Sequence, residues 1–182
     1  DRSWGYYHWD YDTSCAEIWQ KRFIRIFKLY ANYVQMLNDE EDKESKYAKE
    51  LEQNIKRYAD ELNYVRAYLV TFSNGDFGSD QDGLQIKNLI VDGIDTPYIV
   101  AVFANGKRRC WDELPAGYER MFNLVFDIAY RSYILNRGMQ KACGLVIIDE
   151  LDLHLHPSME KTILQRLKLT FPDVQFIVTT HS

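Results

Sequence analysis

The sequence predicts an α/β fold with parallel strands, a small antiparallel sheet and a pair of long helices. The first observation is a short apolar run, residues 145–148 (LVII), that ends in two carboxylates, Asp149 and Glu150. A run without polar alternation predicts a strand buried on both faces, as in a parallel sheet. The second is that a helical stretch from Pro157 and another apolar run, residues 174–178, follow it. Strand, helix and strand at this spacing predict a βαβ unit with two parallel neighbouring strands.

The composition is typical of a globular protein, with 46% apolar and 27% charged residues in a chain of 182. The net charge of −5 makes the whole chain a poor match for nucleic acid, although a local basic patch is compatible with it. Three cysteines, odd in number and far apart, provide no disulfide framework, which favours a reducing cytoplasm. No apolar run approaches the roughly 18 residues of a membrane span, and no signal-peptide layout is present, so no membrane partner is expected. The sequence lacks an initial Met and stops at Ser182, so we expect part of a longer chain.

The first half predicts a helical arm. Residues 1–12 are rich in aromatic and acidic residues. We expect the aromatic side chains to pack against the rest of the fold. The alternative is that they form a platform on which nucleic-acid bases stack. Ser14 and Glu17 form a capping box for a helix over about 14–37. A second helix over about 46–72 has apolar residues at alternating spacings of four and three, typical of an antiparallel hairpin partner. We therefore predict a helical lid or arm over residues 1–83 and a second subdomain over 84–182.

One face of the first predicted helix is basic. Its apolar stripe comprises Ile18, Trp19, Phe23, Ile26, Phe27, Tyr30, Val34 and Leu37. Interleaved with this stripe are Lys21, Arg22, Arg25 and Lys28, which could meet phosphate. Charge opposite an apolar stripe is more often a solvated face.

The region between the arm and the acidic pair predicts a small sheet and a third helix. Residues 73–83 have the composition of a loop, and strand-like runs follow at 84–91, 98–104 and 107–111. Asn105-Gly106 predicts a two-residue hairpin turn between the last two runs. A helix is expected over about 118–137, and its start near Pro115 and Gly117 has free backbone N–H groups that favour an anion.

The predicted βαβ unit brings three polar side chains to one edge of the sheet. Asp149 and Glu150 follow the first strand, and His181 follows the second. Open α/β sheets bind their ligands at this carboxyl edge. Asp149 and Glu150 are adjacent, so on an extended backbone they point to opposite faces, and different roles are expected of them. The pattern has the form of a Walker B motif, in which one acid holds Mg²⁺ and the next handles the attacking water.

These motifs carry a family resemblance. Residues 145–150 (LVIIDE), the following LDLHLHP, and 178–182 (VTTHS) resemble the C-terminal half of an ABC-type ATPase head, in the AAA-like ATPases of the SMC-like and overcoming-lysogenization-defect group. The resemblance covers about residues 84–182 and is vague for 1–83. It implies a mostly parallel P-loop NTPase sheet with flanking helices and an inserted helical hairpin.

The resemblance implies roles at the ATP site of the same chain. Asp149 would hold Mg²⁺, Glu150 would polarise the attacking water, and His181 would contact the γ-phosphate. Residues 151–156, Asp152 among them, would form the D-loop that faces a partner subunit.

It also implies contacts across a head-to-head homodimer. Gly117 lies where the family has its signature motif, so Gly117 and its neighbours Ala116 and Tyr118 would touch ATP bound to the other subunit. The family usually has Ser where this chain has Pro115, which offers neither hydroxyl nor N–H. The contacts would then depend on backbone groups near Gly117, with Tyr118 or Arg120 as side-chain candidates.

The chain departs from the family in one further respect: no G-x-x-x-x-G-K-[S/T] phosphate-binding loop occurs in it. That loop supplies most of the binding of the β- and γ-phosphates. We therefore expect the first lobe to lie elsewhere, and this chain alone to bind ATP poorly and to hydrolyse it negligibly. By analogy, such heads act on DNA or gate a nuclease or other effector, often in bacterial defence against phage.

Two alternatives remain open. A metal-dependent phosphoesterase or nuclease would use the residue types of a Zn²⁺ or Mn²⁺ site, which here are Asp149, Glu150, Asp152, His154, His156 and His181. The histidines could instead only hold the loop before Pro157 by hydrogen bonds to backbone. A non-catalytic scaffold is the other alternative.

Overall fold

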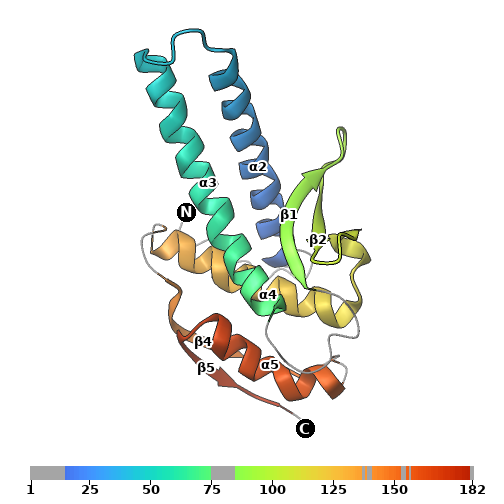
Figure 1. Cartoon of the computed structure of the whole chain (residues 1–182). Coiled ribbons are helices and arrows are strands. Elements are labelled where there is room, and N and C mark those ends of the chain that lie inside the picture. The colour runs from blue at the N-terminus through green and yellow to red at the C-terminus, as the bar shows by residue number, and fades with distance from the viewer. Residues whose placement is uncertain are drawn as a thin grey trace.

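A computed structural model describes residues 15–74, 85–136, 138, 141–152, 155 and 157–180. The predicted docking segment 1–12, the capping residue Ser14 and most of the predicted loop 73–83 lie outside these ranges. The fold is α/β, as predicted (Figure 1). In chain order its elements are α2 (Cys15–Asp39), α3 (Lys46–Ser73), β1 (Ile86–Asp92), β2 (Tyr98–Phe103), β3 (Arg108–Cys110), the 3-10 turn η1 (Trp111–Glu113), α4 (Ala116–Leu135), β4 (Cys143–Ile148), α5 (Pro157–Thr170) and β5 (Asp173–Val178).

Helices α2 and α3 form an antiparallel hairpin that projects from the rest of the molecule (Figure 1). Both have bounds within two residues of the predicted ranges. The side chain of Ser45 caps α3 by accepting a hydrogen bond from the backbone N–H of Ala48 at 2.9 Å. The base of the hairpin is buried, since Phe23 of α2 and Val65 of α3 are fully enclosed.

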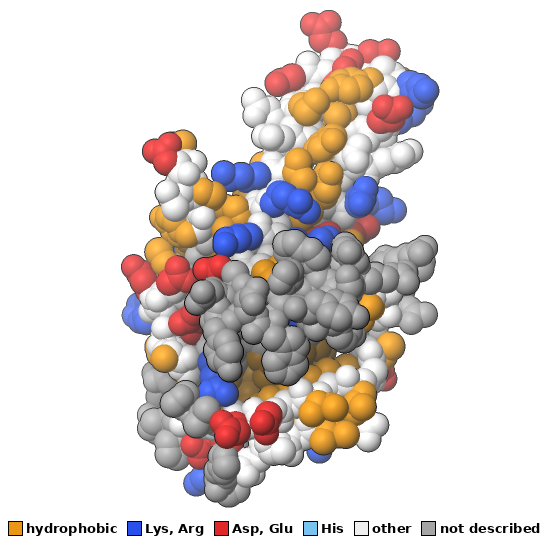
Figure 2. All heavy atoms as spheres, turned by 180° about the vertical axis from the view of Figure 1, so that it is seen from behind, with side chains coloured by type: hydrophobic (Ala, Val, Ile, Leu, Met, Phe, Trp, Pro, Cys, Tyr) orange, Lys and Arg blue, Asp and Glu red, His pale blue; other side chains and the backbone are white. Residues whose placement is uncertain are grey.

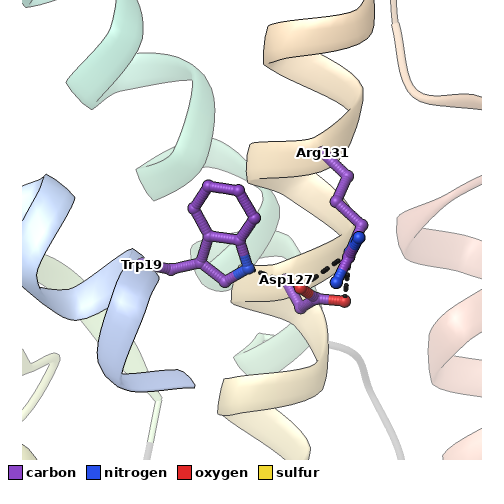
Figure 3. Close-up of polar contacts among 3 residues, drawn as sticks. All are labelled: Trp19, Asp127 and Arg131. Carbon is purple, nitrogen blue, oxygen red and sulfur yellow. Dashed lines mark hydrogen bonds and ion pairs between the residues drawn. The ribbon is translucent and has the colours of Figure 1, made fainter. Parts of the chain in front are cut away.

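The base of the arm and helix α4 share one hydrophobic core with the C-terminal strands. Two polar connections reinforce it. Arg22 donates two hydrogen bonds to the Glu61 carboxylate, and Trp19 Nε1 donates to Asp127, which also accepts from Arg131 (Figure 3). The first connection joins the two arm helices to each other, and the second, from Trp19 of α2 to Asp127 of α4, joins the arm to the rest of the fold. The predicted domain boundary at 83/84 falls outside the described residues and stays a prediction.

The three strands of residues 86–110 form an antiparallel sheet in the order β1-β2-β3, which confirms the predicted small sheet. The predicted two-residue turn is wrong. Phe103 pairs with Lys107, so three residues, 104–106, make the loop. Gly106 adopts a φ of +81°, and its N–H bonds the Phe103 carbonyl at 3.0 Å. A left-handed glycine at the third loop position favours this longer turn over a two-residue one.

Strands β4 and β5 pair in parallel, with Ile148 opposite Val178, which confirms the βαβ unit. Among the described residues, these are the two strands that pair in parallel. The mostly parallel sheet that the resemblance implies is therefore represented in the described part of the chain by two strands. Helix α4 begins at Ala116, two residues before the predicted start.

The prediction that the strand before Asp149 is buried on both faces is wrong for the described part of the chain. Val146 and Ile148 pack against the core, but Leu145 and Ile147 are 56% and 71% exposed, and Ile177 of β5 is 48% exposed. Figure 2 shows hydrophobic side chains gathered at the lower right, over this strand pair. Helix α5 lies in front of the strand pair in Figure 1, and no described element covers the exposed side chains of Leu145, Ile147 and Ile177. None of the described helices is long and apolar enough to cross a membrane.

Candidate functional site at the carboxyl end of strands β4 and β5

Thr179 connects the two predicted acids to the neighbouring strand. Its hydroxyl donates to Asp149 Oδ1 and accepts a hydrogen bond from the backbone N–H of Glu150 at 2.9 Å. Its backbone N–H bonds the Ile148 carbonyl, and its carbonyl accepts from Leu151, both at 3.1 Å. Strand pairing thus continues past the end of β4, and the acids are held beside the end of β5.

Glu150 does not continue the strand. Its φ of +51° is left-handed, the only such value at a non-glycine residue in the described part of the chain. The prediction that Asp149 and Glu150 point to opposite faces because the backbone is extended is therefore wrong at Glu150. A non-glycine residue in this region costs on the order of 1 kcal/mol, so the surrounding contacts must hold it there.

Arg120 of helix α4 contacts the same turn. Its Nη2 donates a hydrogen bond of 3.2 Å to the backbone carbonyl of Glu150. Arg120 also lines a hollow of about 140 Å³ between α4, the end of β4 and α5. The other lining residues are Met121, Leu124, Ile148, Leu151, Leu155 and Ile163. An apolar wall strengthens such a hydrogen bond, because water competes less for the donor and the acceptor.

Sequence reasoning missed Thr179 as a site residue and named Arg120 only as a candidate contact to a partner's nucleotide. A signal for Thr179 existed, because it directly follows the second parallel strand and so must lie at the same edge as Asp149. Arg120 had no comparable signal. It lies 30 residues before Glu150 on another element, and only the packing of α4 against the βαβ unit brings the two together.

The start of helix α4 lies next to this edge, but its predicted phosphate contact stays a prediction. Pro115 is the N-cap and makes no side-chain cap hydrogen bond. Ala116 is exposed, while Gly117 and Tyr118 are half-buried. A Cβ on Gly117 would lie 3.1 Å from Met159 Sδ, so the missing side chain lets α4 approach α5 closely.

The remaining predicted site residues are only partly described. His154, His156 and His181 lie outside the described residues, so neither the γ-phosphate contact of His181 nor the metal site of the alternative enzyme is tested. Asp152 is half-buried, and its carbonyl accepts a hydrogen bond from Leu155 at 3.1 Å. Within the described residues no group of three or more His, Cys, Asp and Glu side chains could hold a metal ion.

The residues present fit a role in Mg²⁺ binding at Asp149. Mg²⁺ prefers oxygen ligands, commonly one or two carboxylates with water and substrate phosphates completing its shell. The Asp149 carboxylate is exposed and accepts one hydrogen bond from Thr179. A carboxylate has about four lone-pair sites, so this hydrogen bond orients the group and still leaves it able to coordinate a cation or its water.

The basic face of α2 is smaller than the sequence suggests. Arg22 lies against Glu61 at 2.7 Å, and its side chain is only 28% exposed. Lys21, Arg25 and Lys28 are exposed, and Lys21 pairs with Glu17 at 3.0 Å. Of the four basic residues that could meet phosphate, Arg22 is therefore already paired with Glu61.

The βαβ unit with two acids at its carboxyl edge, preceded by α4, defines a region of an ABC-type AAA ATPase. The chain belongs to the family described as "AAA domain, putative AbiEii toxin, Type IV TA system", whose profile matches residues 20–182.

Curated relatives are similar over part of the chain. The "Retron Vc95 probable ATPase" of Vibrio cholerae serotype O1 biovar El Tor is 41% identical over 58% of this chain and 20% of its own length. The "Septu protein PtuA" of Bacillus mycoides (strain KBAB4) is 36% identical over 65% of this chain and 17% of its own. The chain thus spans about a fifth of the length of these relatives.

A solved structure from work on "ATP-driven dimerization and DNA stimulated activation of SMC ATPases" is also similar. The similarity covers 70% of this chain and 71% of that one, at 17% identity and a TM-score of 0.47.

Proposed function

We propose that this chain forms the hydrolytic edge of a Mg²⁺-ATP site in an ABC-type ATPase. The observation that carries the proposal is the pair Asp149 and Glu150 at the end of β4, held to the neighbouring parallel strand by Thr179. Membership of the AAA domain family supports it, as does the name "probable ATPase" of a 41% identical relative.

Each residue has a distinct chemical task in this proposal. Asp149, oriented by Thr179, binds Mg²⁺ directly or through water. Glu150 accepts the proton of the attacking water, or orients that water, beside the γ-phosphate. Mg²⁺ held by Asp149 would offset the negative charge that develops on the phosphate during hydrolysis. His181 contacts the γ-phosphate, and Asp152 lies in the loop that faces the second subunit.

The complete site requires groups that this sequence does not contain. It has no phosphate-binding loop of the form G-x-x-x-x-G-K-[S/T]. In this proposal a second lobe provides that loop, and ATP brings two heads together so that Ala116, Gly117 and Tyr118 of one head contact the nucleotide of the other. Closure and hydrolysis then control an effector, a nuclease or a DNA-bound partner, in defence against phage. Relatives named after a retron and after Septu support this setting.

Steady-state ATP turnover by the full-length protein tests the proposal. Removing a general base typically lowers turnover by roughly 10²- to 10⁴-fold. We therefore expect Glu150→Gln to lower kcat at least about 100-fold, with little change in KM. Glu52→Gln, an exposed glutamate on the arm, is the matched control and should leave turnover unchanged.

Two results would contradict the proposal. One is an unchanged kcat in Glu150→Gln. The other is stoichiometric Zn²⁺ or Mn²⁺ in the purified protein without nucleotide, which would favour the metal-dependent phosphoesterase.

A further inference from the structure

The backbone of Glu150 is held from both sides by side chains of other elements. Thr179, which follows β5, accepts its N–H at 2.9 Å. Arg120, one turn into α4, donates to its carbonyl at 3.2 Å. The next N–H, that of Leu151, bonds the Thr179 carbonyl. The peptide groups on both sides of Glu150 are therefore held by residues of other elements.

The left-handed backbone conformation of Glu150 is sterically unfavourable for a residue with a Cβ atom. With φ at +51°, Glu150 relaxes readily toward an ordinary negative φ unless its flanking peptides are held. Such a relaxation rotates the Cα–Cβ bond and carries the carboxylate with it. A displacement of about 1 Å in a catalytic group can lower a rate roughly 100-fold. Contacts that fix the φ angle of Glu150 therefore also fix the position of its carboxylate.

We propose that Arg120 is a positioning residue that sets the direction of the Glu150 carboxylate by holding the Glu150 carbonyl. This inference rests on the proposed function of Glu150 in ATP hydrolysis. Arg120 lies near the start of α4, close to Gly117 in the sequence. It therefore connects the start of this helix to Glu150, the proposed general base of the same chain.

Arginine suits this task better than other donors. Its guanidinium is planar and always charged, and its N–H groups have fixed directions, so it can hold a carbonyl in one place. The apolar residues Met121, Leu124 and Leu155 line the same hollow as Arg120. Lysine reaches a similar distance and can donate to the same carbonyl, but with less directional control. Methionine fills similar space and cannot donate.

The test compares Arg120→Met and Arg120→Lys in the full-length protein by steady-state ATP turnover. We expect Arg120→Met to lower kcat about 10-fold or more while KM for ATP changes less than about threefold, because the contact acts on the base and not on nucleotide binding. Arg120→Lys should recover at least part of the lost kcat. Arg66→Met is the matched control: Arg66 also donates to a backbone carbonyl, that of Leu89 at 2.8 Å, but at the base of the arm.

A double-mutant cycle separates positioning from a merely structural effect. If Arg120 acts through Glu150, Arg120→Met should lower kcat little further once Glu150→Gln is present. A full additional loss in the double variant overturns the inference, as does a rise in KM with unchanged kcat, which would assign Arg120 to nucleotide contact. An equal loss of kcat in Arg66→Met overturns it too. If Glu150→Gln itself leaves turnover unchanged, the proposed function fails first, and this outcome is distinguishable from failure of the Arg120 role alone.

Discussion

The ion pair between Arg22 and Glu61 should be the most sensitive polar contact of the arm. Arg22 Nε and Nη2 lie 2.7 and 2.9 Å from the two Glu61 oxygens, and Glu61 is only 5% exposed. Burial alone lowers the pKa of Arg22, but the hydrogen bond and the charge of Glu61 outweigh it and raise that pKa. The pair is therefore mutually stabilised, and removal of one member leaves the other charge without its partner.

Glu61→Ala is expected to lower the free energy of unfolding by about 2–3 kcal/mol. Breaking a buried pair typically costs about 3–5 kcal/mol. The Arg22 side chain keeps 28% of its surface exposed and can turn partly to water, so we take the value below that range. With a urea m-value of about 1–3 kcal/mol/M, the unfolding midpoint should fall by roughly 1 M or more, followed by the helical circular dichroism signal.

Two controls make the result decisive. Glu44→Ala removes an exposed pair with Lys49 at 3.5 Å and should cost no more than about 0.5 kcal/mol. The double variant Arg22→Met with Glu61→Leu replaces the pair by apolar groups and should be clearly more stable than Glu61→Ala. A Glu61→Ala protein no less stable than Glu44→Ala would refute the reasoning.

Three further predictions concern single side chains. Thr179→Val should lower ATP turnover about 10-fold or more, because Asp149 loses its orienting hydroxyl, whereas Thr179→Ser should keep most of it; kcat measurements check both. The Tyr130 hydroxyl is buried without a hydrogen-bond partner among the described residues, so Tyr130→Phe should raise stability by about 0.5–1 kcal/mol at neutral pH. Burial raises the pKa of Tyr130, so the folded protein keeps a proton that the unfolded chain loses above about pH 10. The free energy of unfolding should therefore fall as the pH rises past about 10. Urea unfolding at high pH should show a smaller fall in Tyr130→Phe, which lacks this proton. Gly117→Ala should cost less than about 1 kcal/mol in thermal unfolding, because the Met159 side chain that a Cβ would meet at 3.1 Å is flexible, and a cost above about 3 kcal/mol would contradict this.

Much of the fold could be predicted because its signals are local. The apolar spacing of the arm helices, the turn residues of the hairpin and the strand–helix–strand order of residues 143–178 all depend on neighbours in the sequence. The same order predicts that the two acids lie at the carboxyl edge of a sheet. The errors also have local causes. A short apolar run does not show whether a second layer covers it, so the exposed face of Leu145 and Ile147 was missed.

The sequence by itself determined the class of this protein and the identity of its two acids, because a parallel strand and the residues at its end occupy consecutive positions in the chain. Only the tertiary structure decided how these acids are held. The left-handed turn at Glu150, the Arg120 contact 30 residues away and the connection of Trp19 to Asp127 over 108 residues depend on how separate elements pack. A residue's own sequence neighbours do not specify such contacts, because a hydrogen bond forms wherever packing brings a donor within about 3 Å of an acceptor.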